Sequence, residues 1–281
     1  MRHSLILMTA LLGTFLLSGC AGDGDAQVQE ALKDINVIDE SNLSELMLTV
    51  SDPEEGVNFF RGASAQNPDR IDLKRGLAKS LIRAGKNSEA VRVWREVLAM
   101  PEATNGDRVS LADALIRNNE WAGAATELNK IPPTFETYER YRLEAMVADS
   151  NKDWKKSDSF YEIATGLTTK PAGVLNNWGF SKLTRGDPKG AEKLFAEALN
   201  YDGKMFTAKN NLVLARAAQG IYDLPVVDMT QTERAELLYT MALAAIKKGD
   251  TSVGKRLLKE AIETHPQYFE AASRSLEALE G

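Results

Sequence analysis

Small side chains recur along most of this sequence at an almost constant interval of 34 residues, and this spacing restricts the possible fold more than any other feature. One series has separations of 34, 34, 33, 34 and 34 residues and comprises Ser44, Ala78, Ala112, Ala145, Gly179 and Val213. A second has separations of 34, 34, 33 and 34 residues and comprises Gly56, Ala90, Ala124, Ser157 and Ala191. A fixed period of this length indicates a stack of copies of one supersecondary unit.

Each unit is predicted to contain two helices. A bulky side chain follows each member of the second series by four residues, and a smaller apolar one follows three residues later: Phe60, Trp94, Leu128, Tyr161 and Phe195, then Ala63, Val97, Ile131, Ala164 and Ala198. Steps of four and three place each trio on one helical face. Turn-prone residues separate the two helices of each unit: Ser51, Gly85, Asn119, Lys152, Gly186 and Gly220.

This pattern resembles the tetratricopeptide repeat from about residue 37 to the C-terminus, and its best copy is the stretch 175–198. The resemblance implies an all-α superhelix, an α-solenoid of about six to seven units in which small residues lie where paired helices cross closely. The regular units are expected at about 37–70, 71–104, 105–137, 138–171 and 172–205.

The sixth unit begins at Phe206 but departs from the pattern. Pro225 and the β-branched pair Val226 and Val227 argue against a second helix over 223–230. Two alternatives follow for this segment: it bends the superhelix or exposes apolar surface to a partner, or it packs onto its own repeat. A capping box at 230–233 then predicts a new helix and a last unit over 231–267, with a capping helix over 267–280 that covers its apolar edge.

The N-terminus has the features of an export signal. An apolar run from Leu5 to Leu17 follows Arg2, and it is too short to span a bilayer comfortably. It ends in Leu17-Ser-Gly-Cys20, which resembles the bacterial lipobox. The resemblance implies a lipoprotein signal peptide over 1–19, a lipidated tether over 20–36 and a repeat domain over 37–281, with the membrane as a partner through Cys20. Ala21 after the cysteine implies the periplasmic face of the outer membrane. The alternative is an ordinary cleaved signal with an incidental cysteine.

The remaining residues favour a non-catalytic protein. The chain has two histidines, His3 and His265, and Cys20 is its single cysteine. Neither a zinc site nor a Cys–His pair is therefore expected, and the sequence has no phosphate-binding glycine loop. We expect no enzyme activity, cofactor, metal or small-molecule substrate. The net charge of −6, with short and interrupted basic runs, also argues against nucleic acid as a partner.

Candidate partner-binding residues lie on the first helices of the units, which line the groove of such a superhelix. Three basic residues four apart could meet an acidic segment, or simply form a solvated face: Arg75, Lys79 and Arg83. Two asparagine pairs, 34 residues apart, could bind a peptide backbone or merely reflect the generic repeat; with the neighbouring aromatic residue these candidates are Asn176, Asn177, Phe180, Asn210 and Asn211. Trp94, Trp121, Trp154, Tyr161 and Trp178 are expected to fill repeats rather than to cage a ligand.

A closer resemblance comes from the lipobox combined with the stretches 52–61, 66–69 and 73–85, which together are similar to the TadD lipoproteins of Tad/Flp pilus assembly. That resemblance implies a pilotin-like protein that binds the pilus secretin at the outer membrane. The alternative function is a periplasmic repeat lipoprotein that scaffolds peptidoglycan enzymes or other envelope assembly machinery.

Overall fold

The computed structural model describes residues 43–280. Cys20, the signal peptide over 1–19 and the tether over 20–36 lie outside the described residues. Residues 43–49 are helical, and the helices that follow are α2 (Pro53–Gln66), α3 (Ile71–Arg83), α4 (Asn87–Leu98), α5 (Asn105–Arg117), α6 (Trp121–Leu128), α7 (Tyr138–Ser150), α8 (Trp154–Gly166), α9 (Ala172–Thr184), α10 (Pro188–Tyr201), α11 (Phe206–Ala218), α12 (Gln231–Lys248), α13 (Thr251–Thr264) and α14 (Glu270–Glu280).

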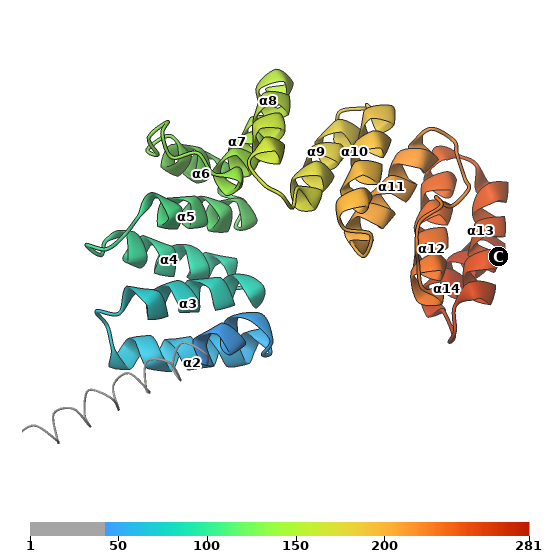
Figure 1. The fold of residues 1–281 in the computed structure, drawn as a ribbon. Coiled ribbons are helices and arrows are strands. Elements are labelled where there is room, and N and C mark those ends of the chain that lie inside the picture. The colour runs from blue at the N-terminus through green and yellow to red at the C-terminus, as the bar shows by residue number, and fades with distance from the viewer. Residues whose placement is uncertain (1–42, 281) are drawn as a thin grey trace, which may run out of the picture.

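The fold is an all-α superhelix, as the repeat predicted. Consecutive helices pair as α3 with α4, α5 with α6, α7 with α8, and α9 with α10, and each pair stacks on the next (Figure 1). The stack changes direction at α7 and α8, so the described chain forms an arch with its first and last helices at opposite ends. No helix in the range 43–280 is long and apolar enough to cross a membrane.

The turns inside the units adopt one recurring conformation. The second residue after the first helix has a left-handed backbone in five units that the sequence marked, with φ of 71° at Gly85, 63° at Asn119, 59° at Lys152, 87° at Gly186 and 80° at Gly220. The next amide then donates back to a carbonyl five residues earlier, as in Lys86 N–H to Leu81 O (2.8 Å) and Asp187 N–H to Lys182 O (2.9 Å). This is the Schellman ending of a helix, which favours glycine and tolerates asparagine.

The close crossings lie where the small residues were predicted. Ala78, Ala112, Ala145 and Val213 are fully buried, whereas Ser44 at the N-terminal edge is half-buried. Gly179 shows why the side chain must be small, because a Cβ atom there would lie 2.6 Å from Cε1 of Phe195. The bulky series is buried as well, with Phe60, Trp94, Leu128, Tyr161 and Phe195 all at most 2% exposed.

The sixth unit has no second helix, as predicted. Between α11 and α12 the segment 219–230 packs onto α11 and onto the units on either side: Leu224 lies against the apolar cluster of α11 to α13, and Val227 against that of α10 and α11. Val226 points fully into solvent. The predicted capping box starts α12, where Thr230 Oγ1 accepts from Glu233 N–H and Glu233 Oε2 accepts from Thr230 N–H.

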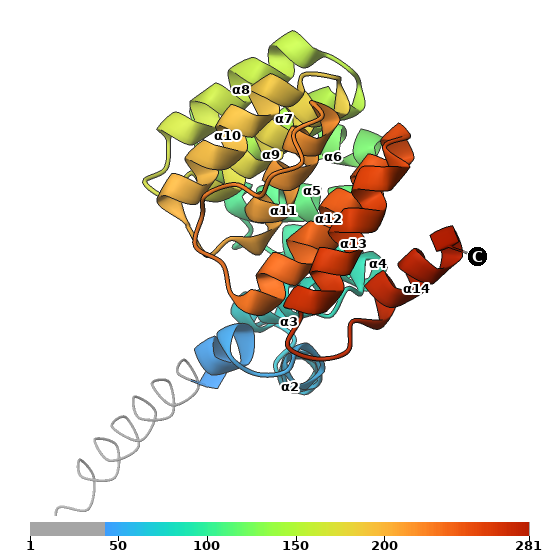
Figure 2. The same cartoon turned by 90° about the vertical axis from the view of Figure 1, so that its right-hand side faces the viewer.

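The C-terminal end is closed by α14, which lies beside α13 (Figure 2). Its Ala272 is fully buried in the last apolar cluster, and Phe269 and Leu276 pack against the same cluster. The predicted capping helix is therefore confirmed, although it begins at Glu270 rather than at residue 267.

Candidate partner-binding groove

A groove of about 510 Å³ runs across the first helices of three consecutive units. Its walls come from α7, α9 and α11, and the residues they contribute are Met146, Asp149, Ser150, Asn176, Asn177, Phe180, Thr207 and Asn211. Four of the predicted groove residues therefore converge in one place, although they come from two different units: Asn176, Asn177, Phe180 and Asn211.

The asparagines have different roles despite their identical spacing. Asn211 donates from Nδ2 to Oδ1 of Asn176 at 3.0 Å, and both side chains are buried. Asn177 donates only to the sulfur of Met146, at 3.7 Å. Because a thioether is a weak acceptor, the Asn177 amide can exchange this hydrogen bond for one to a ligand at little cost in free energy. Asn210 accepts from Thr240 Oγ1 at 2.9 Å, so it links α11 to α12 and does not line this groove.

An apolar side chain forms the open edge of the groove. Phe180 is 53% exposed, and Met146 precedes it in sequence by 34 residues, at the equivalent position of the previous unit. Trp121 is half-buried and closes the groove on the other side of Met146. A large exposed aromatic ring beside half-buried apolar residues is typical of an interaction site.

The back of the groove is rigid and uncharged apart from one engaged carboxylate. Tyr161 is buried and donates from its hydroxyl to Asp149 Oδ2 at 3.1 Å. Burial, with the neighbouring Asp149 carboxylate, raises the pKa of Tyr161 far above its ordinary value, so the hydroxyl stays protonated. Asp149 also accepts from Ser157 Oγ and Ser181 Oγ, at 2.5 and 2.7 Å. A ligand here would therefore meet amides and apolar surface rather than a free charge.

The three basic residues on α3 do not form a free cationic surface. Arg75 donates from Nε and Nη2 to the two carboxylate oxygens of Asp107, at 2.7 and 2.6 Å. Arg83 donates to Met47 O at 2.9 Å and to Ser51 O at 2.8 Å. Lys79 is exposed and lines a separate pocket of about 240 Å³. Two of the three cations thus bind other parts of this chain.

Asp107 was missed by the sequence analysis, and it explains the position of Arg75. Burial by itself raises the pKa of Asp107, but the hydrogen bonds from Arg75 and Thr104 outweigh it and hold the pKa below its ordinary value. Asp107 is the third residue of α5 and forms a capping box with Thr104. The pair Thr104 and Asp107 at cap spacing was the signal in the sequence that could have revealed this role.

The aromatic residues divide between core and groove. Trp94 is buried in the core of its unit, as expected. Trp178 stacks on Tyr161 with ring centroids 6.2 Å apart, and Arg185 lies over the ring of Trp154 at 5.6 Å. Trp121 packs against the core cluster, as expected, but it also lines the groove and donates from Nε1 to Asn119 Oδ1 at 2.7 Å. Its helix α6 is short, which leaves the ring half-buried at the helix start.

The potential metal ligands of the described residues do not cluster, and the one histidine among them has a structural contact. Within residues 43–280 no three His, Cys, Asp or Glu side chains are placed to hold a metal ion. His265 lies at the end of α13, where its Nδ1 is within hydrogen-bond distance of the amide of Gln267 and the ring contacts that of Phe269. This histidine therefore helps to shape the turn into α14.

Comparison with known proteins supports the repeat architecture. A family model described as tetratricopeptide repeat matches residues 75–136. A comparison with curated proteins gave no match.

Several solved structures share the fold. A tetratricopeptide repeat protein from Parabacteroides merdae is 12% identical with a TM-score of 0.55, over 92% of this chain and 100% of that one. A chain of the APC/C hetero-tetramer Cut9–Hcn1 is 16% identical with a TM-score of 0.57, over 81% of this chain and 46% of that one, so the present chain spans less than half of its length. The human IFIT1 dimer with m7Gppp-AAAA is 13% identical with a TM-score of 0.58, over 81% of this chain and 58% of that one.

These likenesses concern the fold, since the identities are low. The recurring Schellman turns and the close crossings extend beyond the stretch that the family model matches. Residues 75–136 match the tetratricopeptide repeat, and the described chain has the superhelical fold of tetratricopeptide-repeat structures.

Proposed function

We propose that this protein is a non-catalytic scaffold that holds a segment of a partner protein in the groove across α7, α9 and α11. The observation that carries the proposal is Phe180, whose ring is 53% exposed at the edge of a groove lined by amide side chains. An exposed aromatic anchor beside hydrogen-bonding groups suits an extended peptide, because the ring takes an apolar side chain and the amides take backbone groups.

We further propose that the protein is lipid-anchored through Cys20 at the periplasmic face of the outer membrane and acts as a pilotin-like partner of a pilus secretin. The lipobox-like stretch and the similarity to TadD lipoproteins support this assignment. Several acyl chains would give durable attachment, since each buried methylene contributes about 0.8 kcal/mol. The second candidate partner class is peptidoglycan enzymes or other envelope machinery, because the same groove would suit their segments.

The groove is tested by photo-crosslinking in cells. A photoreactive amino acid at position 207, on the groove wall, is expected to crosslink to the secretin, and Phe180→Ala is expected to reduce that product at least about tenfold. Tyr201→Ala is the matched control, because Tyr201 is 58% exposed on α10 and does not line the groove. Crosslinks to cell-wall enzymes would favour the second candidate. Equal crosslinking in the Phe180 and Tyr201 variants would reject the groove itself.

The anchor is tested independently of the groove. Cys20→Ser is expected to abolish fatty-acid labelling and to leave the signal peptide uncleaved, while the folded repeat domain keeps its helix content. Equal labelling of the variant and the wild-type protein would contradict the lipid anchor and would leave the groove proposal untouched.

A further inference from the structure

The buried apolar cluster that joins α7, α8 and α9 is the smallest of those in the described chain. One continuous cluster of buried apolar residues joins α2 through α7, from Val57 to Leu143, and another joins α11 to α13 through Val213 and Ala217. At α8 and α9 the cluster is small, and Val174 is the buried apolar residue that α9 contributes to it. The stack changes direction at the same place (Figure 1).

Two carboxylates occupy the positions where other units carry apolar residues. The repeat aligns Asp149 with Ile82, Ile116, Leu183 and Ala217. It aligns Asp158 with Val57 and Val91, which are at most 2% exposed, and one unit further on with Glu192. Acids therefore replace aliphatic residues at both positions of this unit, whereas the next unit carries an acid at only the second of them.

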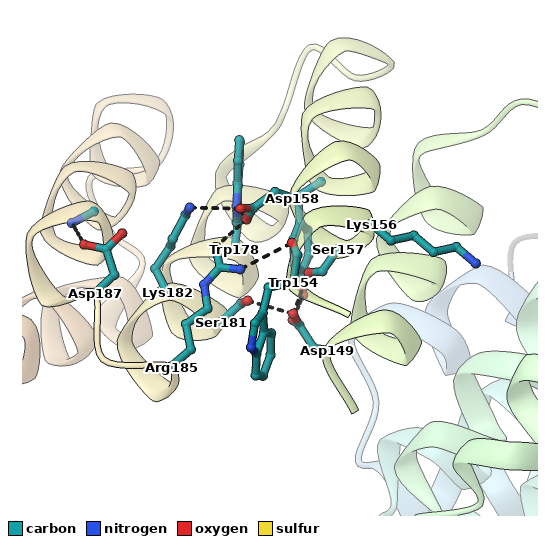
Figure 3. A network of polar contacts seen from close by, with 12 residues as sticks. Asp149, Trp154, Lys156, Ser157, Asp158, Trp178, Ser181, Lys182, Arg185 and Asp187 are labelled. Atoms are coloured by element: carbon teal, nitrogen blue, oxygen red, sulfur yellow. Dashed lines mark hydrogen bonds and ion pairs between the residues drawn. The ribbon is translucent and has the colours of Figure 1, made fainter. Parts of the chain in front are cut away.

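Both carboxylates hold α9 by hydrogen bonds (Figure 3). Asp158 accepts from two side chains of α9, Trp178 Nε1 at 2.6 Å and Lys182 Nζ at 3.0 Å, and from Nη2 of Arg185, the C-cap of that helix, at 2.5 Å. Asp149 accepts from Ser181 Oγ of the same helix at 2.7 Å. Arg185 is only 10% exposed and also donates to the carbonyl of Trp154 at 3.3 Å.

Such a junction differs physically from an apolar one. Hydrogen bonds to carboxylates are short and directional, so they define one relative orientation of the two helices. Asp158 is 32% exposed, so water can take over its hydrogen bonds once the contact opens. An apolar junction has no comparable substitute in water. A contact that is either closed by these hydrogen bonds or open to water is the kind of contact at which packed elements can move relative to each other in a hinge motion.

The groove described above crosses this junction. Met146, Asp149 and Ser150 lie on the α7 side, whereas Asn177 and Phe180 lie on α9. A rotation of α9 relative to α7 and α8 would therefore change the distance between the two walls. We propose that Asp149 and Asp158 act as a clasp that fixes α9 on α7 and α8 and thereby sets the width of the groove. This inference rests on the proposed function only in that a bound partner segment would make use of that width.

The clasp is tested without any partner by spin-label distance measurements. Cys20 is the single cysteine, so in a Cys20→Ser background two labels can be placed at Ser150 and Thr207, on opposite walls of the groove. In the otherwise unchanged chain, one distance is expected to dominate and any longer one to stay below about 10%. In the Asp149→Asn, Asp158→Asn double variant, the longer distance is expected to become the major one.

Glu192→Gln is the matched control. Glu192 stands at the position of Asp158 one unit later and accepts from Arg216 of α11 and from Gln219, the C-cap of that helix. There, however, a fuller buried apolar cluster joins α10 and α11. This variant should leave the distance distribution unchanged. A second label pair at Lys193 and Lys259, both on the C-terminal side of the junction, should not respond in any variant.

An unchanged 150–207 distribution in the folded double variant would overturn the clasp. Should the double variant lose its helical circular dichroism, Lys182→Met gives the same test with one donor removed and the carboxylates kept. A longer distance in that variant supports the clasp, and an unchanged distribution rejects it. Phe180→Ala in the crosslinking experiment reports on the groove alone, so the two proposals fail separately.

Discussion

Asn211 on α11 donates its side-chain N–H to the side-chain oxygen of Asn176 on α9, although the two residues do not occupy equivalent positions of their units. The asparagine pairs repeat after 34 residues, but the hydrogen bond joins the first member of one pair to the second member of the next, 35 residues later. Where these two side chains meet, the first helices of neighbouring units, α9 and α11, are therefore offset by about one residue relative to the repeat. The bond fixes the floor of the groove.

Asn176→Ala should destabilise the fold because it leaves the buried amide of Asn211 without its partner. An unsatisfied buried polar group costs about 1–3 kcal/mol, and chemical denaturation would measure this loss. Asn177→Ala is the control, since the amide of Asn177 contacts only the Met146 sulfur. Equal stability of the Asn176 variant and the wild-type protein would mean that water replaces the bond.

Gly179→Ala should lower the free energy of unfolding by about 1–3 kcal/mol. The added methyl group would lie 2.6 Å from the ring of Phe195, so the ring or α9 must move. Gly173→Ala lies on the same helix with no atom within 4 Å of the added Cβ, and it should be neutral or stabilising. Ala191→Trp should destabilise for the same reason as Gly179→Ala. Wild-type melting of Gly179→Ala would contradict this close crossing.

Lys152→Gly should stabilise the protein, in contrast to most glycine substitutions. Lys152 has a φ of 59°, and a left-handed backbone costs a residue with a Cβ about 1 kcal/mol. Lys155→Gly, three residues later and exposed inside α8, should instead destabilise by about 1 kcal/mol. Thermal melting of both variants shows whether each one is more or less stable than the wild-type protein. A lower melting temperature for Lys152→Gly would contradict the inference that the backbone at Lys152 is strained.

Arg75→Gln should destabilise the fold by about 1.5–3 kcal/mol, because it removes a bidentate hydrogen bond to a buried carboxylate. Lys79→Gln, one turn later and exposed, should leave stability unchanged. An unchanged free energy of unfolding in Arg75→Gln would mean that the contact with Asp107 contributes little, and that Arg75 is available to a partner.

The same pair predicts the acid dependence of stability. Because the folded-state pKa of Asp107 lies below its ordinary value, its contribution is complete above that ordinary value and is lost as pH falls through the lowered pKa. In urea titrations at decreasing pH, the wild-type protein should therefore lose more stability in this acidic range than Asp107→Asn. Parallel curves for the two proteins would contradict the assignment.

Amides from Tyr222 to Val226 should exchange with solvent faster than those of α11 and α12, because this segment lies outside any helix. Val227, whose amide donates to Pro225 O at 3.0 Å and whose side chain packs on the core, should exchange more slowly than its neighbours. Hydrogen exchange followed by mass spectrometry or NMR measures this directly. Uniform slow exchange over the whole segment would indicate a more tightly packed loop.

Much of the architecture could be predicted because it depends on local chemistry repeated many times. A left-handed turn residue, a small residue at each crossing and a bulky one four residues after the second series leave a period that survives sequence variation. Gly85, Gly186 and Gly220 were identified in this way, as were Pro225 and the capping box at Thr230 and Glu233. The sequence did not reveal which basic residues are free to bind a partner. Arg75 and Lys79 follow the same helical spacing, but only Arg75 lies beside a carboxylate of another helix.

The sequence by itself determined the all-helical repeat, its turns and the place where a helix is missing, because each of these follows from residues within one unit. Only the tertiary structure decided which side chains remain available to a ligand. Asn176 is committed to Asn211, Arg75 to Asp107, and Asp158 to three donors in and just after α9, through contacts that join residues 20 to 35 positions apart. The offset between neighbouring helices selects these partners, and that offset is a property of the stacked units rather than of any one of them.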